Sequence, residues 1–97
     1  MRRKQIVSLL QRYGIRPSKR KGQNFLLSER VFQKIVDSLQ LRPEDTVLEI
    51  GVGFGFLTQK IAPLVSRVYA FEIDRRFLSY WEEHLTSFPQ ITLIAQD

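Results

Sequence analysis

Three glycines at alternate positions, Gly51, Gly53 and Gly55, directly follow an apolar run and are the residues of this sequence best suited to holding a small molecule. Glycine has no side chain, so the backbone N–H groups of such a turn can come close to a ligand. A helix that begins near Phe56 would also point its first N–H groups towards an anion. The pattern therefore predicts a nucleotide-type site built on backbone amides.

The spacing of these glycines argues against a dinucleotide site. A nicotinamide or flavin fingerprint needs Gly-x-Gly-x-x-Gly, and its last position is Phe56 when counted from Gly51. Counted from Gly53, that position is Thr58. A Gly-x-Gly-x-Gly turn suits a ligand without a pyrophosphate, such as S-adenosylmethionine, whose carboxylate can lie on the same amides. The competing interpretation is a tight turn between a strand and a helix that binds no ligand.

Acidic residues follow two later apolar runs. Glu72 lies 21 residues after Gly51, where a carboxylate can accept hydrogen bonds from the two hydroxyls of a ribose. Asp97 follows the third run, at the same edge of the expected sheet, and can accept a hydrogen bond from an adenine amino group. Ile73 either packs against the adenine or simply fills space. Glu49 is a charge within an apolar strand and needs a partner.

The elements that would position these residues alternate along the chain. Helical spacing and cap residues predict four helices. The first covers 5–13, and the second is capped by Ser28 and has a buried stripe of Val31, Phe32, Ile35, Val36 and Leu39. The third starts near 56 and is ended early or kinked by Pro63, and the fourth covers 75–86 with Asp74 as its N-cap. The third helix would turn Leu57, Ile61, Leu64 and Val65 to the sheet. In the last helix we interpret Trp81 as core and His84 as a surface residue.

Short apolar runs between turn residues predict three strands, 46–50, 67–72 and 91–95, the first of them buried. Strands that alternate with helices form parallel sheets. We therefore predict an α/β fold with three parallel strands and flanking helices, the N-terminal half of a doubly wound, Rossmann-like sheet.

The composition is that of one small globular domain. Hydrophobic residues make up 43% and charged residues 26% of the 97 positions, which excludes a wholly disordered chain. No apolar run approaches the roughly 20 residues that span a bilayer. The chain has no cysteine and a single histidine, so we do not expect a metal site. The absence of cysteine also fits a reducing compartment, and we expect a cytoplasmic location.

Charge is divided unequally along the chain. Residues 1–34 contain ten Lys or Arg and one acid, a net charge of +9, whereas residues 35–97 contain five basic and nine acidic side chains, a net charge of −4. Such segregation indicates a polyanion partner, and we expect nucleic acid. The candidate RNA contacts lie in one basic tract and are Arg16, Lys19, Arg20 and Lys21. The alternative is a basic loop that is only solvated.

Four short motifs follow one another along the chain in a specific order and spacing. They are Gly22-Gln23-Asn24-Phe25-Leu26, Leu48-Glu49-Ile50-Gly51-x-Gly53-x-Gly55-x-Leu57-Thr58, Phe71-Glu72-Ile73-Asp74 and Gln96-Asp97. Together they resemble the ribosomal RNA adenine N6,N6-dimethyltransferase family over roughly residues 16–97. The resemblance implies a class I methyltransferase fold, S-adenosylmethionine as the methyl donor, and dimethylation of adenine N6 in small-subunit ribosomal RNA.

The resemblance also assigns cofactor-binding residues. In that family the Asn and Leu of the Gln-Asn-Phe-Leu motif cover the cofactor, which assigns Asn24 and Leu26. The first glycine, the strand-end acid and the later Asp also bind it, which assigns Gly51, Glu72 and Asp97. These three were indicated by the residues themselves, together with Gly53 of the same turn, whereas Leu26 was not.

The resemblance divides the chain into two parts. Residues 1–27 would be a basic arm with the cofactor-covering motif, and residues 28–97 the N-terminal half of the cofactor domain. The family's Asn-Leu-Pro-Tyr type catalytic motif would follow Asp97. We therefore expect an N-terminal fragment of a larger enzyme, without catalytic residues of its own and inactive alone, whose open sheet edge offers a surface for self-association.

The match departs from the family inside the glycine turn, where Val52, Phe54 and Phe56 are bulky. Cofactor affinity would suffer unless these side chains point away from the ligand.

Three other functions compete with small-subunit RNA dimethylation. One is dimethylation of large-subunit ribosomal RNA of the macrolide-resistance type, which shares the motifs. Another is a non-catalytic RNA-binding or ribosome-assembly module, which the presence or absence of the catalytic motif in the natural protein would decide. A nicotinamide-binding half domain is disfavoured because Phe56 stands where its motif needs a third glycine. Selective binding of NADH would favour this function again.

Overall fold

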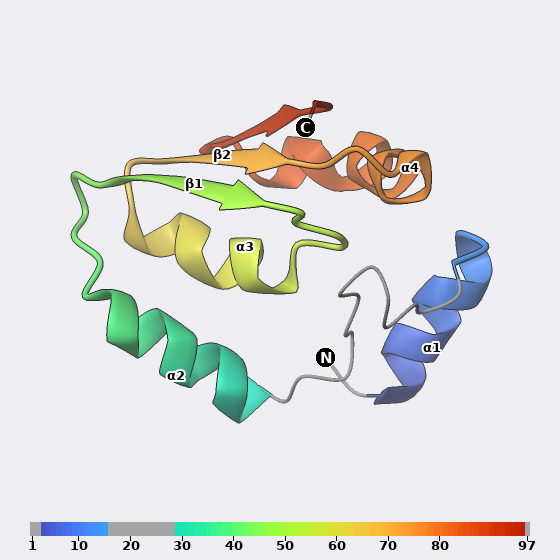
Figure 1. Cartoon of the computed structure of the whole chain (residues 1–97), viewed down its shortest axis with the longest axis horizontal. Helices are drawn as coiled ribbons and strands as arrows, with labels where there is room; N and C mark the ends of the chain where they lie inside the picture. Colours follow the sequence, from blue (N-terminus) through green and yellow to red (C-terminus); the bar gives the residue numbers. More distant parts are fainter. Residues whose placement is uncertain (1–2, 16–28, 97) are drawn as a thin grey trace.

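The computed structural model describes residues 3–15 and 29–96. Its centre is one parallel sheet with the strand order β1-β2-β3 (Figure 1). The strands are β1 (Thr46–Ile50), β2 (Arg67–Phe71) and β3 (Ile91–Ile94). The helices are α1 (Arg3–Arg12), α2 (Glu29–Leu39), α3 (Phe56–Ile61) and α4 (Arg75–His84), with short 3-10 turns η2 (Ala62–Leu64) and η3 (Leu85–Ser87). The predicted α/β fold with three parallel strands is confirmed.

Parallel pairing brings the carboxyl ends of the strands to one edge of the sheet. Ile50 lies opposite Phe71, which lies opposite Ile94. The segments that leave the strands at this edge are therefore neighbours. They include residues 51–55 after β1, here called the glycine loop, and the turn between β2 and α4.

The two faces of the sheet are covered differently. Val68 and Ala70 of β2 are fully buried. They pair with Val47 and Glu49 of β1, and Glu49 contacts Thr58 of α3, so they point to the face that α3 covers. Leu48 and Ile50 of β1 point to the opposite face and are 64% and 71% exposed. The prediction of a buried first strand is wrong for this face. A parallel strand is buried on both faces only when helices cover each face of the sheet. The helices of the described residues cover only one face.

The core lies between the sheet and the helices. Its least exposed large side chains include Trp81, Phe54 and Ile61. Leu10 of α1 and Ile15 just after it belong to the same cluster of buried side chains. The segment 3–15 is thus packed onto the domain, while the predicted boundary at residue 27 lies outside the described residues and stays a prediction.

Helix α3 is short because a proline follows it. Pro63 cannot donate a helical hydrogen bond, and the chain continues as η2. The predicted early end is confirmed. The tighter turn leaves Leu64 45% exposed, so its predicted place on the sheet face is wrong, whereas Ile61 and Val65 are buried as predicted.

Helix α2 buries fewer residues than its apolar spacing predicts. Phe32 and Val36 are buried, but Val31 and Leu39 are 39% and 48% exposed. The main contact of α2 is with α3, and Figure 1 shows it as an outer layer below that helix. A helix in this position turns only a narrow stripe to its neighbour, so the predicted stripe is wrong at Val31 and Leu39.

Candidate functional site

The glycine loop has a backbone that other residues rarely adopt. Gly51, Gly53 and Gly55 have φ angles of 72°, 57° and 76°. These left-handed values are strained for residues with a Cβ atom. At Gly51 an added Cβ would meet no atom of the described residues within 4 Å, so this part of the chain leaves open space beside Gly51.

Most N–H groups of the glycine loop donate within the chain. Those of Gly51 and Val52 donate to the carbonyl of Phe71 over 2.8 and 3.2 Å, and that of Gly55 donates to the carbonyl of Val52 over 2.8 Å. The sequence led us to expect these groups to face an anion. They instead extend the pairing with β2 and close a tight turn, so the three N–H groups fix the shape of the loop.

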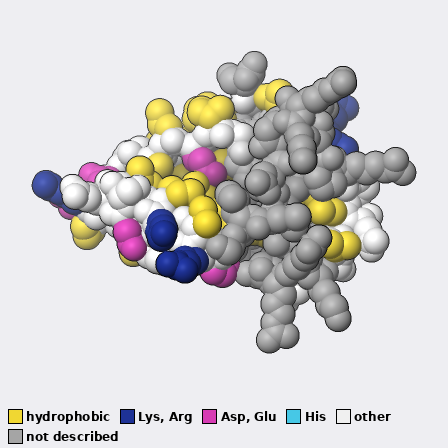
Figure 2. Space-filling view, turned by 60° about the horizontal axis from the view of Figure 1, so that its bottom comes forward, with side chains coloured by type: hydrophobic (Ala, Val, Ile, Leu, Met, Phe, Trp, Pro, Cys, Tyr) yellow, Lys and Arg dark blue, Asp and Glu magenta, His cyan; other side chains and the backbone are white. Residues whose placement is uncertain are grey.

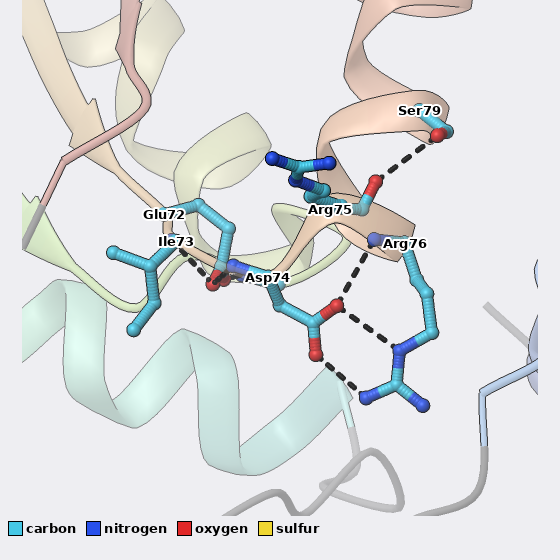
Figure 3. A network of polar contacts seen from close by, with 7 residues as sticks. Glu72, Ile73, Asp74, Arg75, Arg76 and Ser79 are labelled. Carbon is cyan, nitrogen blue, oxygen red and sulfur yellow. Dashed lines mark hydrogen bonds and ion pairs between the residues drawn. The ribbon is translucent and has the colours of Figure 1, made fainter.

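Glu72 closes the loop from the end of β2. Its side chain is buried, and its Oε1 accepts the N–H of Gly53 over 2.7 Å. Its Oε2 accepts the N–H groups of Ile73 and Asp74 over 2.9 and 3.0 Å (Figure 3). A carboxylate has about four acceptor positions, and these bonds use three of them. Glu72 therefore holds two loops together, and the hydrogen bonds within the described residues leave one of its acceptor positions unused.

Trp81 of α4 contacts the glycine loop from inside the core. Its indole Nε1 donates to the carbonyl of Gly53 over 2.7 Å. An added Cβ on Gly55 would lie 2.2 Å from Cζ2 of the same ring. Sequence analysis assigned Trp81 to the core alone. A buried indole N–H needs an acceptor, and that requirement is the signal that could have indicated the contact.

The bulky residues of the glycine loop point into the core. Phe54 is 1% exposed, and its ring lies 5.0 and 5.1 Å from the rings of Phe77 and Tyr80. Val52 is also buried, while Phe56 is half-buried. Because glycines alternate with these residues, the large side chains pack inward, and the concern about cofactor affinity does not apply to Val52 and Phe54.

Glu49 joins β1 to α3. Its Oε1 accepts the hydroxyl of Thr58, which is fully buried, over 2.7 Å. Burial raises the pKa of the Glu49 carboxyl, while the hydrogen bond from Thr58 acts in the opposite direction. The predicted need for a partner is thus met within the chain.

The start of α4 lies beside Glu72. Asp74 caps the helix as predicted, since its Oδ1 accepts the N–H of Arg76 over 3.0 Å. The guanidinium of Arg76 also contacts this carboxylate, at 2.6 Å (Figure 3). Ile73, between Glu72 and Asp74, is 61% exposed and offers an apolar surface next to the buried carboxylate.

Several predicted site residues lie outside the described residues: Asn24, Leu26, Asp97, Arg16, Lys19, Arg20 and Lys21. Of the predicted cofactor residues, the structure brings Gly51, Gly53 and Glu72 together. On the face in Figure 2, some of the described basic side chains lie beside acidic ones, whereas those at the upper right of the view do not. Lys60 forms an ion pair with Glu29.

Two further properties concern the described residues only. Within 3–15 and 29–96, no group of His, Cys, Asp and Glu is arranged to hold a metal ion. None of the helices in these two segments is long and apolar enough to cross a membrane.

Known sequences resemble the chain over most of its length. Residues 16–97 match the family described as ribosomal RNA adenine dimethylase. Ribosomal RNA small subunit methyltransferase A of Pediococcus pentosaceus is 42% identical over 93% of the chain, and that of Thermotoga maritima is 41% identical over 91%. The chain spans 30% and 32% of the length of these two relatives.

Solved structures with the same fold include two related proteins. The 23S rRNA methyltransferase ErmE is 35% identical with a TM-score of 0.69, over 76% of this chain and 30% of its own. A dimethyladenosine transferase from Plasmodium falciparum is 28% identical with a TM-score of 0.65, over 76% of this chain and 28% of its own. With the match over residues 16–97, these similarities show that the chain belongs to the ribosomal RNA adenine dimethylase family.

Proposed function

We propose that this chain forms the cofactor-binding part of an S-adenosylmethionine-dependent enzyme that dimethylates adenine N6 in small-subunit ribosomal RNA. The observation that supports it most strongly is the glycine loop, closed by Glu72 at the carboxyl edge of the sheet, in a chain of this family. The relatives named small subunit methyltransferase A favour the small subunit as the source of the RNA.

In this proposal each part of the site has a separate task. The open space beside Gly51 admits the ligand. The remaining acceptor position of Glu72 receives one ribose hydroxyl, fewer than the two predicted from the sequence, because three backbone N–H groups already use the carboxylate. Ile73 lies beside it as an apolar platform for the adenine.

Residues outside the described segments would complete the site, Asn24 and Leu26 by the resemblance and Asp97 also by its place after the third strand. Asn24 and Leu26 would cover the cofactor, and Asp97 would accept a hydrogen bond from its adenine amino group. With Gly51, Gly53 and Glu72, they make up the proposed cofactor-binding set.

The bound cofactor would supply a methyl group on a sulfonium centre. The amino lone pair of the target adenine is delocalised into its ring, so it must be held in line and polarised by hydrogen-bond acceptors. We assign no catalytic residue within the 97 positions. The contribution of this part is to hold the donor at the edge of the sheet.

The basic arm would hold the RNA. Arg16, Lys19, Arg20 and Lys21 would contact phosphates, and RNA affinity would then fall with rising salt concentration. This chemistry fits an enzyme that works on ribosomal RNA in the cytoplasm.

A second candidate is dimethylation of large-subunit ribosomal RNA. The similarity to the 23S rRNA methyltransferase ErmE, at 35% identity, favours it. Methylation of isolated small and large ribosomal subunits by a longer protein that contains this chain would separate the two, because each candidate predicts label in only one subunit.

Binding of the cofactor can be tested on the chain itself by calorimetric titration with S-adenosylmethionine, with NADH as the control ligand. We expect saturable binding of S-adenosylmethionine alone. Substitution Ile73→Ala should weaken it about fivefold, because roughly 1 kcal/mol of apolar contact is lost. Leu48→Ala is the matched control, since Leu48 is 64% exposed but lies on the uncovered face of β1.

The outcomes separate the interpretations. Equal weakening by both substitutions would remove Ile73 from the site. Binding of NADH in place of S-adenosylmethionine, or no binding by a folded chain, would contradict the proposed cofactor.

A further inference from the structure

Both polar backbone groups of Gly53 are held by side chains from distant positions. The N–H donates to Oε1 of Glu72 over 2.7 Å, at the end of β2. The carbonyl accepts the indole N–H of Trp81 over 2.7 Å, from α4. A glycine has no side chain that could restrict its own conformation, so these two contacts determine how the middle of the glycine loop is oriented.

The ring of Trp81 restricts the loop a second time. Trp81 is fully buried, and a Cβ atom on Gly55 would lie 2.2 and 2.6 Å from Cζ2 and Cη2 of its ring. The third glycine therefore allows the loop to lie directly against the indole. One side chain thus hydrogen bonds to Gly53 and packs on Gly55.

We propose that Trp81 is a positioning residue that gives the glycine loop its ligand-binding shape before a ligand arrives. The proposal rests on the proposed function, because the ligand is taken to be the cofactor of that site. Trp81 is fully buried in the core. It acts through the backbone of Gly53 and Gly55.

The physical reason is the conformational freedom of this loop. Three glycines in five residues have many accessible conformations, and ordering them only on binding would reduce affinity. Leucine or phenylalanine at position 81 could fill part of the same space, but neither can donate a hydrogen bond to the carbonyl of Gly53. The indole N–H therefore gives Trp81 a role that an apolar core residue could not have, because it holds the carbonyl of Gly53.

The first test needs no ligand. Trp81→Phe keeps an aromatic ring and removes the N–H donor, and amide hydrogen exchange of Gly51, Gly53 and Gly55 is then measured by NMR. We expect exchange about tenfold faster at these glycines than in the unaltered chain, as for the loss of one hydrogen bond. Val68→Ala is the control, because it opens the core at the other end of β2.

A merely structural role for Trp81 predicts a different result. The exchange rates of the three glycines would then rise in both Trp81→Phe and Val68→Ala, in proportion to the loss of global stability in each variant. That result would overturn the proposal whether or not the chain binds a cofactor.

The second test measures affinity for S-adenosylmethionine in the same variants. We expect about tenfold weaker binding for Trp81→Phe and unchanged binding for a folded Val68→Ala. Equal affinity of Trp81→Phe and the unaltered chain would overturn the role of Trp81 and leave the proposed function intact. If the unaltered chain bound no S-adenosylmethionine while its glycine exchange was slowed by Trp81, the proposed function would fail and only the ordering of the loop would stand.

Discussion

The glycine loop and the uncovered face of β1 are adjacent in the sequence, yet they are built in opposite ways. In the loop, the N–H groups of Gly51, Val52, Gly53 and Gly55 all donate to named acceptors. On the uncovered face, apolar side chains such as Ile50 project into solvent. The difference teaches that the shape of the loop depends on specific contacts with the covered side of the sheet. We therefore expect changes at the loop and its partners to be severe and changes on the uncovered face to be mild.

The largest effect is expected for Gly55→Ala. The new Cβ would collide with the ring of Trp81, and the φ of 76° would be strained. Together these should lower the free energy of unfolding by about 3 to 4 kcal/mol. Denaturant unfolding followed by circular dichroism measures it. The matched control is Gly51→Ala, where a similar φ but open space should cost only about 1 to 2 kcal/mol. Equal losses in the two variants would show that Trp81 does not restrict the loop.

A smaller but still large effect is expected for Glu72→Ala. It removes the acceptor of three backbone N–H groups, and we expect a loss of about 2 to 3 kcal/mol in the free energy of unfolding. Glu72→Gln should lose nearly as much, because its NH₂ group would face N–H donors. Leu48→Ala, on the uncovered face, should stay within about 0.5 kcal/mol. A stable Glu72→Ala chain would contradict the closing role of this carboxylate.

The smallest effect concerns pH and Glu49, which lies on the covered side of β1. Its pKa in the folded chain is raised above the ordinary value of 4.5, chiefly by burial. The folded state therefore holds its proton more tightly than the unfolded state, and the free energy of unfolding should fall as pH rises from 4.5 through the raised pKa. Glu49→Gln should remove this fall while keeping an acceptor for Thr58.

The measurement is a series of unfolding curves above pH 4.5. Below that range Glu29 interferes, because its hydrogen bond with Lys60 lowers its pKa to about 2. The stabilisation that Glu29 contributes is lost as pH falls from 4.5 towards 2. Identical pH profiles for Glu49→Gln and the unaltered chain would show that the burial of Glu49 has no energetic consequence.

Features set by a few neighbouring residues could be predicted from the sequence. Local turn and cap chemistry predicts the bounds of β1 at Thr46 and Ile50, an early end of α3 before Pro63 and the cap at Asp74, and the structure has all of them. β2 and β3 each end one residue before the prediction, because the end of a strand depends on its pairing partner as well as on its own residues.

Features that depend on contacts between distant residues could not be predicted. Trp81 and Gly53 are 28 positions apart, and only the packing of α4 brings them together. The three donors of Glu72 include the N–H of Gly53 in the glycine loop, 19 positions earlier in the chain. The exposure of Leu48 depends on whether helices cover its face of the sheet. The residues of β1 alone do not determine that.

The contact of Trp81 with the glycine loop also makes this residue an intrinsic fluorescent probe of the loop. Trp81 is its only tryptophan, so all indole fluorescence comes from a ring that is packed on Gly55 and hydrogen bonded to Gly53. Any ligand that shifts the loop changes the surroundings of this one emitter. Movement of the loop can therefore be followed in solution without attaching a dye, by the colour and intensity of the protein's own emission.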